Sequence, residues 1–306
     1  MLFIISLISF IAINLAPNSF FASGELNPNI TPEAIEELKS IYGLDKPLYI
    51  QFFSWISSIL QLDFGISFTS GERVKEEILS RIPITLTINI VSMILIFIIS
   101  LYFGIKSAMK KNSIFDRFTN QLSLLSFSMP SFYLALVLVL VFSIKFELFP
   151  IAGLHSVPND GSLNYYLDFA WHLTLPIFII VFGGIGSLIL YIRALTIEIL
   201  KSDYIFFARA RGLDNKKILR YYILPNLYPP VITLLGLSLP GIIGGSVILE
   251  TIFSIDGMGL LFYQSALSHD YPVIMGILII GAFLTLIGNM FADLILLKLN
   301  PNYNEK

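Results

Sequence analysis

The sequence contains no cysteine, and only 13% of its 306 residues are charged. The lack of cysteine excludes disulfides, thiolate metal sites, iron–sulfur clusters and thiol nucleophiles. Charged residues occur at about half the frequency of an average soluble domain, whereas 56% of the residues are hydrophobic. The formal net charge of −2 provides no overall basic surface for nucleic acid. Together these shortages indicate a membrane protein with several spans and no nucleic-acid partner.

The sequence also lacks the Gly-x-x-x-x-Gly-Lys-Ser/Thr phosphate-binding loop, so we expect no ATP site in this chain. Histidine is scarce, and the spacing of His155, His172 and His269 pairs none of them as metal ligands. Asp293, the acidic residue closest to a span interior, has no evident partner. An intramembrane enzyme would need a nucleophile with a base, paired carboxylates or a metal site built from histidines. We therefore predict no catalytic residue, no metal site and no bound cofactor.

Long intervals without Asp, Glu, Lys or Arg mark the predicted spans. A helix that crosses the hydrocarbon core needs about 20 apolar residues. Apolar residues run continuously through these intervals, which favours helices over a closed barrel. The five intervals are 82–105, 118–144, 169–192, 221–249 and 271–292.

Residues 1–16 form another apolar stretch, which is short for a span. One interpretation is a signal peptide with small residues near Ala22 and Ser23, but no Lys or Arg precedes its apolar core. We prefer a first transmembrane helix whose start codon has been placed too far downstream. The prediction is therefore an all-α membrane protein with six transmembrane helices. A large external segment covers 17–81, a membrane domain 82–298, and a cytoplasmic tail 299–306.

The distribution of lysine and arginine predicts the orientation. Residues 106–117, residues 193–220 and the C-terminal tail hold 13 of the 19 basic residues. Because cytoplasmic loops are enriched in Lys and Arg, we place these regions and both termini in the cytoplasm.

Two helices are predicted in the external segment. The first covers 31–43, where Thr31 is an N-cap and Gly43 ends the helix. The second covers 47–61 and is amphipathic. It has two open interpretations, a helix at the membrane interface or the core helix of a small domain.

The loop over 193–224 differs from the other connections because it holds seven basic residues. Its first part is predicted to continue the helix of the fourth span, and Gly212 can adopt the left-handed conformation that ends a helix. Asp214 or Asn215 can cap a second short helix, and Pro225 is expected where the fifth span begins. By composition alone, the loop is a basic anchor on anionic lipid. A DNA-binding helix–turn–helix is a poorer interpretation, because the membrane would cover one of its faces.

The spacing in this loop resembles the coupling-loop signature of inner-membrane permease subunits of ABC importers. That pattern is Glu-Ala-Ala, three residues, Gly, nine residues, then Ile-x-Leu-Pro. The positions that match are Ala208, Gly212, Leu224 and Pro225, and those that depart are Phe206, Phe207 and Tyr222. The peptide branch of this family commonly lacks the Glu and has a form similar to Asp203-Tyr204 followed by Ala208-Arg209-Ala210-Arg211-Gly212-Leu213.

Further motifs of the peptide branch extend the resemblance over nearly the whole chain. They include Gly43-Leu44-Asp45-Lys46-Pro47-Leu48, Leu62-Asp63-Phe64-Gly65-Ile66-Ser67, Arg81-Ile82-Pro83, His172-Leu173 with Leu175-Pro176, Glu250-Thr251-Ile252-Phe253, Gly257-Met258-Gly259 and Asp270-Tyr271-Pro272. The sequence departs from the family at Pro17-Asn18-Ser19, where Pro-Gly-Asp is more usual.

The resemblance implies a permease subunit of an ATP-driven importer of di- or oligopeptides. It implies a second homologous permease, two cytoplasmic ATP-binding subunits that hold ATP and magnesium, an external solute-binding protein and surrounding membrane lipid. A cytoplasmic coupling helix between helices 4 and 5 would contact the ATPase through Ala208, Arg209, Ala210, Arg211, Gly212, Leu213 and Asp214. Nickel or another solute of the same branch is an alternative cargo, and a secondary transporter without an ATPase is an alternative class.

Two further groups of residues are candidates on weaker grounds. Small residues in the fifth span either pack helices closely or line the translocation path: Gly236, Ser238, Gly241, Gly244, Gly245 and Ser246. At the external end, Glu250 and Asp256 either face the binding protein or stabilise the turn over 256–259.

Overall fold

The computed structural model describes residues 4, 6–8, 10–11, 46–238 and 246–299. This part of the chain is almost entirely helical and contains no strand, apart from one isolated bridge between Ile66 and Arg73. The helix predicted over 31–43 and most of the predicted first span lie outside the described residues. The helices of the first half are α4 (Leu48–Leu60), α5 (Val74–Met109), α6 (Ile114–Ser128), α7 (Ser131–Leu138) and the π-helix η1 (Val139–Lys145).

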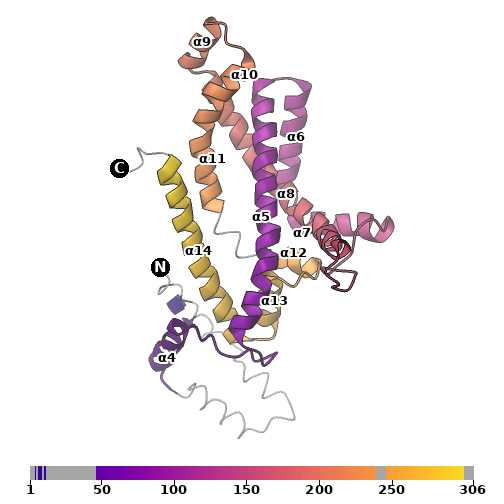
Figure 1. Cartoon of the computed structure of the whole chain (residues 1–306), viewed down its shortest axis with the longest axis vertical. Helices are drawn as coiled ribbons and strands as arrows, with labels where there is room; N and C mark the ends of the chain where they lie inside the picture. Colours follow the sequence, from indigo (N-terminus) through magenta and orange to yellow (C-terminus); the bar gives the residue numbers. More distant parts are fainter. Residues whose placement is uncertain (1–3, 5, 9, 12–45, 239–245, 300–306) are drawn as a thin grey trace.

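The helices of the second half begin with α8 (Leu163–Leu200), the longest in the described chain. The remaining helices are α9 (Asp203–Ala210), α10 (Asn215–Ile218), the π-helix η2 (Leu219–Ile223), α11 (Leu224–Ser238), α12 (Val247–Ile252), α13 (Met258–Leu267) and α14 (Tyr271–Leu299). Figure 1 shows α5, α6 and α8 as a tall column, with α9 and α10 at one end and α4 and α13 at the other.

The column is held by close packing of α5 and α6 on α8. A Cβ added at Gly104 of α5 would lie 2.8 Å from the Ile192 side chain. A Cβ added at Gly186 of α8 would lie 2.5 Å from the backbone oxygen of Ser123 in α6. Only glycine therefore lets these backbones approach so closely, as is common between helices in membranes.

Three described helices, α5, α8 and α14, are long and apolar enough to cross a membrane. The predicted span 118–144 is not one straight helix, because α6 and the α7–η1 pair meet at 99°. Pro130 explains the break: it has no N–H to donate, and it forces Met129 out of the helical conformation to ψ 120°. This bent pair would be a fourth span. The predicted span 221–249 is described as a helix only up to Ser238.

Helix α5 begins earlier than the sequence predicts. α5 begins at Val74 rather than at residue 82, so the end of the predicted external segment is helical, with Glu76 and Glu77 in its first turn. Acidic side chains there stabilise the positive end of the helix dipole. The helix predicted over 47–61 is confirmed as α4, which packs Phe52 beside Met275 of α14.

Candidate functional site

A short helical hairpin forms the end of the molecule above α5 and α6 (Figure 1). The prediction that the helix of the fourth span continues into this loop is confirmed, because α8 runs past residue 192 and ends at Leu200. A separate helix, α9, begins at Asp203. The Ser202 hydroxyl donates a hydrogen bond to the Ile199 carbonyl oxygen at 2.6 Å. A side-chain hydrogen bond of this kind competes with the helical ladder and helps to end the helix.

The turn between α9 and α10 follows the sequence prediction. Gly212 has a φ of +81°, and the Leu213 N–H donates to the Ala208 carbonyl at 3.2 Å. The Asp214 carboxylate accepts a hydrogen bond from the Lys217 N–H at 3.0 Å and caps α10. Gly212 is required for its backbone conformation rather than for space, because no atom of a neighbouring residue lies within 4 Å of an added Cβ.

The two sides of α9 differ sharply in burial. Ile205 and Ala208 are buried, and Ile205 belongs to an apolar cluster with Ile218, Ile223 and Leu227. On the opposite side, Phe206 is 69% exposed and Phe207 is 60% exposed. Arg209, Ala210, Arg211, Gly212 and Asp214 are exposed as well, and Leu213 is half-buried.

The sequence prediction therefore named one residue that faces inward, Ala208, and missed two that face outward, Phe206 and Phe207. The available signal was their position: both replace residues of the family signature at its opening triad. Adjacent exposed phenylalanines next to basic residues form a surface that combines apolar area with positive charge.

A buried ion pair fixes the helices below this hairpin. Arg193 of α8 donates to both oxygens of Asp116 in α6, at 2.7 and 2.9 Å. Asp116 also accepts hydrogen bonds from the Ser107 hydroxyl of α5 and, at 2.9 Å, from the Asn112 N–H. The carboxylate thus joins α5, α6 and α8 within one group.

Below α10 the chain continues as one helical stretch from Asn215 to Ser238, through η2 and α11. Pro225 is the second residue of α11, where the fifth span is expected to begin, although helix precedes it without a break. Proline lacks the N–H needed for the α-helical pattern. The π-helical turn η2 directly before it accommodates the break in that pattern.

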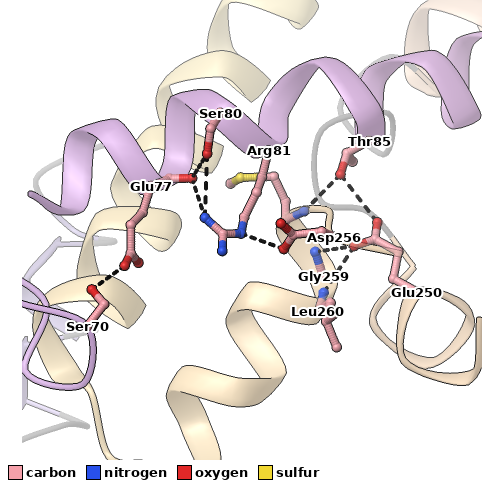
Figure 2. A network of polar contacts seen from close by, with 10 residues as sticks. Ser70, Glu77, Ser80, Arg81, Thr85, Glu250, Asp256, Gly259 and Leu260 are labelled. Atoms are coloured by element: carbon pink, nitrogen blue, oxygen red, sulfur yellow. Dashed lines mark hydrogen bonds and ion pairs between the residues drawn. The ribbon is translucent and has the colours of Figure 1, made fainter. Parts of the chain in front are cut away.

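A polar network lies at the opposite end of α5 (Figure 2). Glu250 of α12 is only 4% exposed, and it accepts hydrogen bonds from the N–H groups of Gly259 at 2.7 Å and Leu260 at 3.0 Å. The Thr85 hydroxyl of α5 lies 3.3 Å from the same carboxyl group. Burial raises the pKa of Glu250, and these hydrogen bonds oppose the increase. Glu250 thus holds the turn at the start of α13 against α5.

An exposed ion pair stands beside this buried carboxyl group (Figure 2). Arg81 Nε lies 2.8 Å from Asp256 Oδ1, and the Asp256 side chain is 59% exposed. Asp270, 1% exposed, accepts hydrogen bonds from the Ser67 hydroxyl at 2.6 Å and the Thr69 N–H at 3.0 Å. Segments that lie far apart in the sequence are therefore joined at this end.

The small residues predicted for the path are not brought together as a group. Gly236 is buried within α11, and Ser246 caps α12 by accepting from the Leu249 N–H at 3.4 Å. Of the described candidates, Ser238 lines the cavity of about 600 Å³ between α5, α8 and α11, and Gly236 and Ser246 do not. The predicted residues Gly241, Gly244 and Gly245 lie outside the described residues.

Two of the three histidines are near Asp168 at the start of α8. His172 Nδ1 lies 2.8 Å from the Asp168 carbonyl oxygen, and His172 Nε2 lies 3.2 Å from Ser156 Oγ. His155 stacks on Tyr165 with ring centroids 3.9 Å apart. Within the described part of the chain, no three His, Cys, Asp or Glu residues are arranged to hold a metal ion.

Comparison with known families gives the decisive observation. Residues 100–305 match the family described as the inner membrane component of binding-protein-dependent transport systems, and residues 1–89 match its N-terminal family. The chain belongs to this family. It is a permease subunit of an ABC importer and not an enzyme, which confirms the class expected from the sequence.

Relatives resemble the permease over almost its full length. The oligopeptide transport system permease protein AppB of Bacillus subtilis is 35% identical, and the match covers 97% of this chain and 93% of AppB. The dipeptide transport system permease protein DppB of Lactococcus lactis is 32% identical, with coverage of 98% and 94%. The metal–staphylopine import system permease protein CntB of Staphylococcus aureus is 32% identical, with coverage of 91% and 85%.

The fold of the permease is also found among solved structures. A chain of the MetNI methionine ABC transporter in an inward-facing conformation has a TM-score of 0.58 and 17% sequence identity. The similarity covers 73% of this chain and 96% of that chain. It supports the shared fold of the membrane helices.

Proposed function

We propose that the permease forms half of the translocation path of an importer for di- or oligopeptides. The names of AppB and DppB, which are similar over nearly the whole chain, support this cargo. A metal chelate is the second candidate, because CntB is also 32% identical. Family membership decides against the alternative class of a self-sufficient secondary transporter.

In this proposal the permease crosses the membrane six times, with both termini in the cytoplasm. The hairpin α9–α10 then lies on the cytoplasmic side with its basic residues, as positive-inside topology requires. The polar network around Glu250 lies on the external side, where Asp256 is accessible to a docked binding protein. The permease pairs with a second homologous permease within membrane lipid, and nucleic acid has no role.

The ATP-binding subunits, two in number, hold the ATP and magnesium and contact the permease through α9 and its turn. The single observation that carries this assignment is the exposed pair Phe206 and Phe207 at the end of a rigidly held helical column. Exposed aromatic side chains that cluster with arginine are typical of interface hot spots. A complementary ATPase groove has an apolar floor for the phenylalanines and carboxylates at its rim for Arg209 and Arg211.

The structure suggests how a movement of the ATPase subunits would reach the helices. Ile205 and Ala208 are buried on the inner side of α9. Ile205 packs in one apolar cluster with Ile218 and Ile223, which belong to the helical stretch that leads into α11. Asp116 and Arg193 hold α8 to α5 and α6 immediately below. A displaced α9 therefore moves packed helices as a unit, and rigid-body switching opens the path to either side of the membrane.

Solute-stimulated ATP hydrolysis in liposomes tests this function. The complete complex would be assembled with the binding protein and trialanine, and wild type compared with the double variant Phe206→Ala/Phe207→Ala. We expect the stimulation to fall by about tenfold or more, because hot-spot truncations cost about 2 kcal/mol or more. A second variant, Gly212→Asp, should also lose stimulation, because the φ of +81° strains any residue other than glycine.

Phe146→Ala is the matched control, since Phe146 is 56% exposed but follows η1, far from α9 in the sequence. This variant should retain stimulation. If the double variant assembles and is stimulated like wild type, the assignment of α9 to coupling is wrong. If wild type is not stimulated by any peptide but responds to a metal chelate, the chelate is the cargo.

A further inference from the structure

A cavity of about 600 Å³ lies between α5, α8 and α11. Its wall on α5 runs from Asn89 to Phe97, roughly midway along the uncharged stretch between Arg81 and Lys106. Its volume falls in the range of small-molecule sites, about 300–1,000 Å³. The position is therefore inside the membrane, between the external network and the cytoplasmic hairpin.

The polar groups of this cavity are all neutral. Asn89 and Ser92 come from α5, Ser187 and Tyr191 from α8, and Ser238 from α11. Among the described residues, no Asp, Glu, Lys, Arg or His lines it. The remaining wall is apolar. Hydroxyl and amide groups from three helices therefore line a cavity that is otherwise apolar.

One of these groups has an unmet hydrogen-bonding capacity. Ser92 is 1% exposed, and its hydroxyl makes no hydrogen bond. Hydroxyls elsewhere on the helices donate to the carbonyl four residues earlier, as Thr87 does to Pro83 and Ser238 does to Leu234. Because a buried hydroxyl without a partner costs about 1–3 kcal/mol, a polar group that reached Ser92 from the cavity would relieve that cost.

We propose that this cavity is a contact site for the solute in transit, in which Asn89, Ser92 and Tyr191 hydrogen-bond to the uncharged peptide groups of the solute. This inference rests on the proposed function and specifies what the membrane part recognises. The described wall offers no counter-ion for the charged amino and carboxyl termini of a peptide such as trialanine, so it is not suited to hold those ends inside the membrane. Peptide N–H and C=O groups, by contrast, match neutral donors and acceptors and occur in every peptide.

The consequence is a division of selectivity. The cavity contacts the backbone that all peptides share, so it discriminates little between neutral side chains of similar size. A charge added to its wall should create a preference that the natural wall does not have. Ser187 is suited to that change, because it lines the cavity and is exposed.

Cysteine labelling in the complete reconstituted complex tests occupancy of the cavity directly. The chain has no cysteine, so Ser187→Cys provides a unique thiol in this subunit, whose modification by a methanethiosulfonate is followed as a mass shift of the subunit. We expect turnover with binding protein and trialanine to slow labelling about fivefold or more, because the solute covers the thiol while it passes. Thr174→Cys, also exposed on α8 but outside the cavity, is the matched control and should label at the same rate with and without trialanine.

Two further variants separate recognition from structure. Ser92→Ala should reduce trialanine uptake severalfold, whereas Ser100→Ala should leave uptake unchanged. Ser100 is equally buried on α5 and equally without a hydrogen bond, but it does not line the cavity. Ser187→Asp should shift the ratio of Ala-Lys-Ala to Ala-Glu-Ala uptake about tenfold towards the lysine peptide, through a charge pair in a low dielectric.

Stimulated ATP hydrolysis, measured in the same liposomes, distinguishes failure of the cavity inference from failure of the proposed peptide import. If hydrolysis is stimulated but trialanine neither slows the labelling of Ser187→Cys nor distinguishes Ser92→Ala from Ser100→Ala, the cavity is covered by lipid or the second permease and the inference is overturned. If wild type shows no stimulated hydrolysis with any peptide, the peptide function fails and the inference fails with it.

Discussion

The two ends of α5 are held by carboxylates in different ways. At the end beside the α9–α10 hairpin, which we propose is cytoplasmic, Asp116 is paired with the guanidinium of Arg193 and with Ser107 of α5. At the opposite end, which we propose is external, Glu250 has no cationic partner within the described contacts and is bound by Thr85 of α5 and by backbone N–H groups.

Between these ends, the same helix carries Ser92 and Ser100, whose buried hydroxyls have no partner. Carboxylates therefore hold the two ends of α5, whereas its middle packs on α8 and carries two buried hydroxyls that make no hydrogen bond. The ends can transmit a displacement, and Ser92 in the middle lines the cavity proposed for the solute.

Removal of the cytoplasmic carboxylate should have the largest effect. Asp116→Ala leaves Arg193 partly buried without its counter-charge, and breaking a buried pair in this way costs about 3–5 kcal/mol. Thermal unfolding of the purified complex should therefore show a large loss of stability. The double variant Asp116→Ala/Arg193→Leu should recover part of the loss, and no recovery would show that Asp116 acts through Ser107 and Asn112 rather than through the ion pair.

Removal of the external carboxyl group should have an intermediate effect. Glu250→Ala leaves the N–H groups of Gly259 and Leu260 without an acceptor, at a cost of about 1–3 kcal/mol for each buried group left unpaired. Glu250→Gln keeps an acceptor oxygen and should lose much less stability. If both variants unfold at the same temperature, the turn at α13 does not depend on this acceptor.

The exposed ion pair at the same end should contribute least. A double-mutant cycle of Arg81→Ala and Asp256→Ala should give a coupling energy of about 0–1 kcal/mol, since Asp256 is largely exposed and solvent screens the pair. A coupling energy well above this range would mean that the external end is fastened by charge, as the cytoplasmic end is.

Much of this arrangement was predictable, because local signals decided it. Gly212 and Asp214 fixed the turn and the cap of α10 through their own backbone and side-chain chemistry. Charge-free intervals located α5, α8 and α14, and the start of α14 at Tyr271 was predicted correctly. The other ends were missed, since helices continue past the apolar stretch wherever capping residues such as Ser162 extend them.

The rest depended on contacts between distant segments, which spacing alone does not reveal. The pairing of Asp116 with Arg193 joins residues 77 positions apart, and that of Thr85 with Glu250 joins residues 165 positions apart. The cavity draws one wall from each of three helices, so the small residues of the fifth span were a poor guide to it. The orientation of Phe206 and Phe207 depended on which side of α9 is buried, and a helix of eight residues gives too short a pattern to decide that.

A cross-link between this permease and its ATPase partner tests whether α9 contacts the ATP-binding subunits. Because the chain has no cysteine, Ala210→Cys on the exposed side of α9 can be joined by a short photo-activated thiol reagent to whatever it touches in the assembled complex. Lys111→Cys, exposed in the turn between α5 and α6, is the matched control. We expect Ala210→Cys to cross-link to an ATP-binding subunit and Lys111→Cys not to. Cross-linking only to lipid or only from position 111 would contradict this assignment of α9.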